Sequence, residues 1–109
     1  MSSQETANIT SAEMEETIAR ISSHRGVEGV MIMNKEGAII QSTLDEDKAK
    51  LHSSALSDLT AKASHIVSLL NRDDELTFLR IRSKQREIMI SPEKGFILVV
   101  LQNPNITDE

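Results

Sequence analysis

Histidine is the residue type with which this chain could most readily hold a metal ion or move a proton near neutral pH. Its three histidines are His24, His52 and His65. On a helix, His52 and His65 would point about 140° apart, so they could not share a ligand face. His24 lies near the expected end of a helix, where a positive charge is favourable without any further role. We therefore expect no metal site and no catalytic histidine.

Other residue types that support catalysis are no better arranged. Asp73 and Asp74 lie in a polar stretch, where solvated loop charge is a simpler interpretation than a pair of acid-base catalysts. Gly26 and Gly29 lack the glycine-lysine-serine ending of a phosphate-binding loop. The chain has no cysteine, which excludes disulfides, thiol nucleophiles and thiolate metal sites. We expect a protein that is not an enzyme and needs no cofactor.

Basic residues recur at every second position in Arg80, Arg82, Lys84 and Arg86, within a chain whose formal net charge is −5. One interpretation is that they solvate and protect an edge strand. A second is that Arg80, Arg82 and Lys84 anchor an acidic segment of a partner protein. Nucleic-acid binding is not expected, because the chain is acidic and no aromatic residue lies between the basic ones to stack on bases.

The composition is that of one globular domain, with 39% hydrophobic and 27% charged residues over a length of 109. The only aromatic residues are Phe78 and Phe96, so the core must consist of Leu, Ile, Val and Met. No apolar run approaches the ~20 residues of a membrane span, and the polar N-terminus lacks the apolar stretch of a signal peptide. We expect a cytosolic protein that does not insert into membranes.

The front half of the chain predicts a helix followed by a hairpin. Thr10 and Glu13 have the spacing of a capping box, so a helix should begin there and end before Gly26. The run Val30–Met33 is continuously apolar, which is typical of a strand covered on both faces. A polar turn then leads into a second strand at 38–42.

Residues 45–70 contain neither glycine nor proline and predict one long helix. Large apolar side chains fill one arc of this helix, and small ones cluster on the opposite face. A solvent-exposed face usually carries Lys, Glu and Arg, so the small side chains predict close packing against another backbone. The alternative is a serine-rich face that is merely solvated. The small residues selected as packing candidates are Ser53, Ser57, Thr60, Ala61 and Ser64.

Three strands complete the chain, at 76–82, 87–91 and 96–102. The order of elements is α-β-β-α-β-β-β, which predicts an α+β fold with a five-stranded antiparallel sheet and a helix on either face. We place the folded domain at residues 11–104, between a flexible N-terminal arm (1–10) and a flexible tail (105–109).

Several segments together resemble the roadblock family of dynein light chains over roughly residues 13–104. The segments that carry the resemblance are Asp74–Lys84, Glu87–Met89, Leu101–Pro104, Glu15–Thr17 and Gly26–Gly29. The fold order is also that of profilin, but a polyproline binder needs an aromatic groove, and the chain has no Trp or Tyr.

The resemblance implies a homodimer, or a heterodimer with a related light chain, in which the long helix and the third strand meet their symmetry mates. Combined with the small helix face, it predicts an interface at Ser53, Ser57, Thr60, Ala61, Ser64, Thr77, Phe78 and Leu79. The partner it implies is a segment of the dynein intermediate chain, which serves microtubule-based transport. The expected location is the cytoplasm, associated with the cytoskeleton, with cilia as a further location. An alternative function is a roadblock-like scaffold that regulates a small GTPase.

Overall fold

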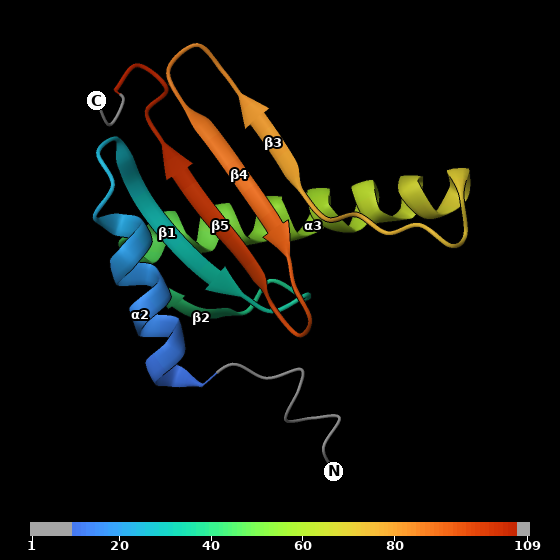
Figure 1. Cartoon of the computed structure of the whole chain (residues 1–109), viewed down its shortest axis with the longest axis horizontal. Helices are drawn as coiled ribbons and strands as arrows, with labels where there is room; N and C mark the ends of the chain where they lie inside the picture. Colours follow the sequence, from blue (N-terminus) through green and yellow to red (C-terminus); the bar gives the residue numbers. More distant parts are fainter. Residues whose placement is uncertain (1–9, 107–109) are drawn as a thin grey trace.

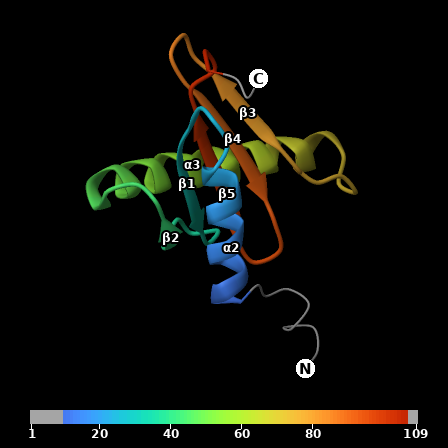
Figure 2. The same ribbon diagram turned by 60° about the vertical axis from the view of Figure 1, so that its left-hand side comes forward.

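The computed structural model describes residues 10–106. A five-stranded antiparallel sheet, ordered β2-β1-β5-β4-β3, carries helix α2 on one face and helix α3 on the other (Figures 1 and 2). The predicted α+β fold is therefore confirmed. The predicted arm and tail fall largely outside the described residues. The elements are α2 (Ser11–Ser22), β1 (Val27–Met33), β2 (Ile39–Ser42), α3 (Glu46–Leu70), β3 (Leu79–Arg82), β4 (Glu87–Pro92) and β5 (Ile97–Gln102).

Helix α2 begins at the predicted capping box. The Thr10 hydroxyl accepts a hydrogen bond from the Glu13 backbone N–H at 3.0 Å, and the Glu13 carboxylate accepts one from the Thr10 N–H at 2.9 Å. These two bonds satisfy backbone donors that have no partner within the helix. The helix ends at Ser22, ahead of Gly26, whose φ of 87° suits only glycine well. The sequence thus places both ends of α2 correctly.

The core lies mainly between α3 and the sheet. Strand β1 lies next to the central strand β5, and Val30–Met33 are buried without exception, which confirms a strand covered on both faces. Leu79, Ile81 and Ile88 pack against the core from the β3–β4 side of the sheet. The fully packed cluster consists of Met31, Met33, Ala49, Leu56, Ile90, Ile97, Val99 and Leu101.

Helix α3 presents small side chains to its own sheet. Ser53 and Thr60 are only 5% and 4% exposed, so the sequence-based expectation that they form an outward face for a second chain is wrong. The reason is the turn between β1 and β2, which approaches α3 very closely. A Cβ atom added at Gly37 would lie 2.7 Å from the Ser57 hydroxyl oxygen. The small residues do allow another backbone segment to pack closely against α3, but that segment is the β1–β2 turn of the same chain.

Because the small side chains face inward, large apolar ones face outward. Five such residues on α3, which we call the α3 ridge, are 37–83% exposed. The second half of the helix also extends past the β3 edge of the sheet, where no strand of this chain lies beneath it (Figure 1). The α3 ridge comprises Leu51, Leu59, Ile66, Leu69 and Leu70.

Strand β3 is an edge strand, as predicted, but it covers only Leu79–Arg82 instead of 76–82. Leu79 pairs with Ile90, so extending the same register would place Thr77 opposite Pro92. Proline has no N–H to donate, and the ladder stops before it. Residues 75–78 therefore continue the edge without a partner strand of their own.

The close approach at Gly37 is testable by Gly37→Ala. The added methyl group meets Ser57, and φ at this position is 96°, so we expect the free energy of unfolding to fall by about 2–3 kcal/mol. Gly95→Ala is the matched control, because φ is 86° there but the turn is exposed, and it should cost about 1 kcal/mol. Urea unfolding measures both. Equal losses would show that Ser57 does not restrict the turn.

Candidate functional site

The sheet face that carries α2 is only partly covered. Helix α2 packs on β1, and β3 and β4 lie clear of it (Figure 1). The register aligns Arg80 with Met89 and Val100, and it aligns Arg82 with Glu87. These side chains consequently share one open part of the sheet face.

A groove of about 450 Å³ occupies this open part. Met89 and Val100 form its apolar floor, while Ile21 at the end of α2 and Ile106 after β5 form its walls. We call it the arginine groove. Its charged and ionisable lining residues are His24, Arg25, Arg80, Arg82 and Glu87.

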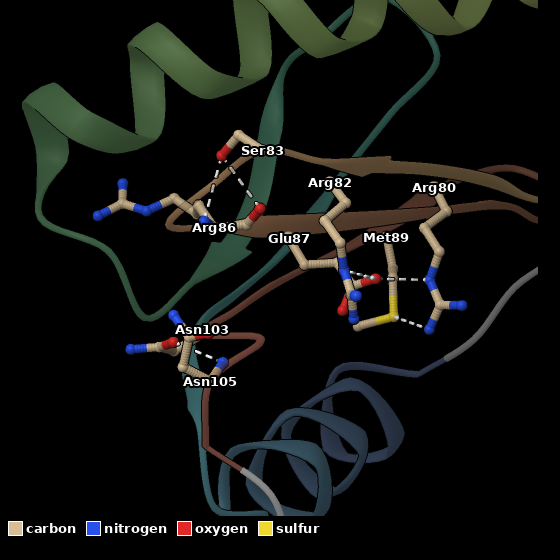
Figure 3. Close-up of polar contacts among 8 residues, drawn as sticks. All are labelled: Arg80, Arg82, Ser83, Arg86, Glu87, Met89, Asn103 and Asn105. Carbon is tan, nitrogen blue, oxygen red and sulfur yellow. Dashed lines mark hydrogen bonds and ion pairs between the residues drawn. The ribbon is translucent and has the colours of Figure 1, made fainter.

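Glu87 is the buried charge of the groove. It is 1% exposed, and its carboxylate lies 2.8 Å from Arg80 Nε and 3.5 Å from Arg82 Nε (Figure 3). Neither carboxylate oxygen has a well-aligned hydrogen-bond donor among residues 10–106, so these contacts are ion pairs. An uncompensated buried carboxylate would be very costly, and the two arginines compensate it.

The two arginines remain partly open to solvent above Glu87. Their side chains are 57% and 63% exposed. The Arg80 Nη2 atom also donates a weak hydrogen bond to the Met89 sulfur at 3.9 Å (Figure 3). Both arginines thus present fixed positive groups at the surface.

The structure separates the basic residues that the sequence groups together. Arg80 and Arg82 meet at Glu87, whereas Lys84 lies exposed in the turn between β3 and β4, and Arg86 pairs with Glu28 at 3.6 Å. Lys84 is therefore not part of the groove. Glu87 was not identified from the sequence as part of the site. A hairpin with its turn at residues 83–86 would have placed Glu87 opposite Arg82, and this was the available signal.

A second surface lies at the β3 edge. Phe78 is 50% exposed there, Thr77 is exposed, and Leu79 is half-buried. A hollow of about 510 Å³ separates the second half of α3 from residues 75–77, and Ser64 helps to line it.

The predicted interface residues thus divide into two groups. Ser53 and Thr60 are covered by their own sheet and unavailable to a partner. Ala61 is exposed, while Ser57 and Ser64 are half-buried. Those three and the β3-edge residues stay predicted contacts. The exposed ridge of large apolar residues on α3 is the feature that the sequence did not identify.

Two classes of site find no support in residues 10–106. No cluster of three or more His, Asp or Glu side chains in that range is placed to hold a metal ion. None of the helices there combines the length and the apolar character needed to cross a bilayer.

A family model described as Roadblock/LC7 domain matches residues 13–102, which is most of the chain. The chain belongs to the Roadblock/LC7 family. The resemblance noted in the sequence is therefore confirmed at the level of the family, and the matched residues include the β3 edge and the charged residues of the arginine groove.

Solved structures share the roadblock fold at low sequence identity. A Roadblock/LC7 domain from Streptomyces avermitilis has a TM-score of 0.74 and 13% identity, covering 80% of this chain and 74% of that one. MglB from Myxococcus xanthus has a TM-score of 0.72 and 15% identity, covering 87% and 81%. A structure of MglB in a tetrameric arrangement has a TM-score of 0.73 and 8% identity, covering 88% and 76%. At such identities the likeness concerns the fold alone.

The stabilisation of the buried Glu87 carboxylate by Arg80 and Arg82 can be measured with a double-mutant cycle. Arg80→Gln with Arg82→Gln leaves a buried carboxylate unpaired, so the free energy of unfolding should fall by about 2–4 kcal/mol. In a Glu87→Gln background the same two changes should cost less than about 1 kcal/mol, because no buried charge remains. Urea unfolding of the four proteins gives the coupling. Additive losses would mean that the arginines do not stabilise Glu87.

Proposed function

We propose that this roadblock protein is a non-catalytic scaffold that self-associates and binds a segment of a larger protein. The observation that carries the proposal is the α3 ridge beside the open β3 edge. Large exposed apolar patches on small domains mark interaction surfaces, and open strand edges pair with other chains. The second half of α3, which carries Ile66, Leu69 and Leu70, extends past the β3 edge, so one partner could cover this part of the ridge and the edge together (Figure 1).

A two-fold axis beside β3 is the arrangement that uses both features. It would pair β3 with its own copy and extend the sheet into the second subunit. The half of α3 that extends past β3 would then lie over the neighbouring sheet. The part of the α3 ridge beyond the β3 edge (Ile66, Leu69 and Leu70) and Phe78 would then adjoin the second subunit, and the burial of their apolar surface would favour a homodimer. A related light chain could take the second position.

The partner that we propose first is a segment of the dynein intermediate chain. Its support is the resemblance of residues 74–89 and 101–104 to dynein light chains of the roadblock type. In this role the protein would support motor assembly or cargo attachment in microtubule-based movement. It would act in the cytoplasm, associated with the cytoskeleton, or in cilia.

A roadblock scaffold that regulates a small GTPase is the second candidate. The structural comparisons fit a scaffold outside a dynein motor better, because the relatives with a stated source are proteins of Streptomyces, Myxococcus and Thermus. The tetrameric arrangement of one MglB structure also supports association between copies. Both candidates use the same fold and differ only in what is bound.

The proposed interface predicts the behaviour of Ile66→Asp. This residue is exposed in the single chain, so a charge there should leave the fold intact and weaken self-association at least about tenfold. Phe78→Asp should do the same at the strand edge. Ala12→Asp adds the same charge to an exposed position of α2, on the other face of the sheet, and should change nothing. Light scattering over a dilution series measures the mass. An Ile66→Asp protein that dimerises normally would remove α3 from the interface.

The identity of the partner is decided by affinity capture from cell extract. Tagged wild-type protein should retain dynein intermediate chain, detected by antibody, if the first candidate is right. Retention of a small GTPase without intermediate chain would select the second candidate. The Ile66→Asp protein serves as the control, since binding that depends on the dimer should be lost with it.

A further inference from the structure

We propose that the arginine groove binds an acidic segment of a partner protein, and that Glu87 is a positioning residue that holds Arg80 and Arg82 in place for it. The inference builds on the proposed partner-binding role but names the site and the chemistry of its ligand. It lies on the α2 face of the sheet, opposite to α3 and its ridge (Figure 2).

The local charge selects an acidic ligand. Arg80 and Arg82 share the single buried carboxylate of Glu87, so this cluster carries one net positive charge. The chain as a whole has a formal net charge of −5, so this local excess runs against its average. A positive concavity in an otherwise acidic protein attracts acidic segments and repels basic ones.

Glu87 explains how the arginines are held. Each arginine approaches the buried carboxylate through its Nε atom, at 2.8 Å and 3.5 Å. A guanidinium has four further N–H donors on its Nη atoms, and these suit the two oxygens of a carboxylate. Fixing the stem of each arginine lowers the conformational entropy that binding would otherwise cost. Glu87 thus acts through the arginines and is itself too buried to touch a ligand.

The apolar floor adds a second requirement. Met89 and Val100 offer apolar surface beneath the charged rim, within a volume of about 450 Å³. That volume is in the range of ligand clefts, roughly 300–1,000 Å³. A segment that combines acidic and aliphatic side chains satisfies both rim and floor. Single-stranded nucleic acids are usually bound by aromatic side chains that stack on the bases, and the groove lining contains no aromatic residue.

The test uses a fluorescein-labelled peptide of glutamate and leucine, with a lysine-for-glutamate peptide and a single-stranded oligonucleotide as controls. Fluorescence anisotropy should show binding of the acidic peptide alone, weakening as salt is raised. Binding of the oligonucleotide with equal affinity, or of the lysine peptide, would overturn the proposed ligand class.

Variants then locate the site. Glu87→Gln combined with Arg80→Gln and Arg82→Gln leaves no unpaired buried charge, so it should fold and lose at least about tenfold in affinity relative to wild type. Lys84→Gln removes a basic charge four residues from Arg80 but outside the groove, and it should stay within about twofold. Equal losses in both would show that only diffuse charge is involved.

Glu87→Gln alone separates positioning from simple electrostatics. Removing a negative charge from the groove should strengthen binding of an acidic peptide if charge alone mattered. We expect affinity to fall about threefold or more instead, because the arginines lose the group that orients them. Tighter binding would refute the positioning role.

Light scattering on the same samples keeps this inference apart from the proposed scaffold function. A wild-type monomer that binds the acidic peptide would contradict the self-association proposal and support the groove. A wild-type dimer that does not bind the peptide would support the self-association proposal and contradict the proposed ligand of the groove.

Discussion

The close contact of α3 with its own sheet determines which surfaces of this protein remain exposed. Ser53 and Thr60 are buried there, and Gly37 brings the β1–β2 turn against Ser57. With small groups inward, the helix must turn its large apolar groups outward, because the two sets lie on opposite sides of one cylinder. The exposed ridge is therefore a consequence of how the domain packs internally.

A second constraint operates on the other face of the sheet. Glu87 lies in the strand at a position that faces the open part of the α2 side, and β3 places Arg80 and Arg82 beside it. A buried carboxylate cannot remain without cations, so the arginines are tied to it while their outer atoms stay exposed. Burial on one side of the ion pairs thus creates an ordered positive surface on the other.

The α3 ridge and the arginine groove lie on opposite faces of the sheet, and β3 contributes to both surfaces, through its open edge and through Arg80 and Arg82. Self-association would use the α3 ridge and the β3 edge, and the arginine groove would stay open on the α2 face (Figure 2). A two-fold axis beside β3 would place one groove on each side of it.

The sequence by itself determined the local structure and the family. The capping box at Thr10 set the start of α2, the apolar run at Val30–Met33 specified a doubly covered strand, and the segments around residues 74–89 indicated a roadblock protein. These signals depend on residues that are close together in the sequence, so they can be recognised without knowing which distant residues are in contact.

Only the tertiary structure decided which side of α3 is buried and what Arg80 and Arg82 contact. Periodicity identifies two faces of a helix, but the close approach of the turn at Gly37 determined that the small face is the inner one. Alternation placed the arginines on one face of a strand, while pairing with β4 supplied Glu87 as their counter-charge. The buried face of α3 and the contacts of the two arginines each depend on a second segment of the chain. No local sequence pattern shows that this second segment lies close in space.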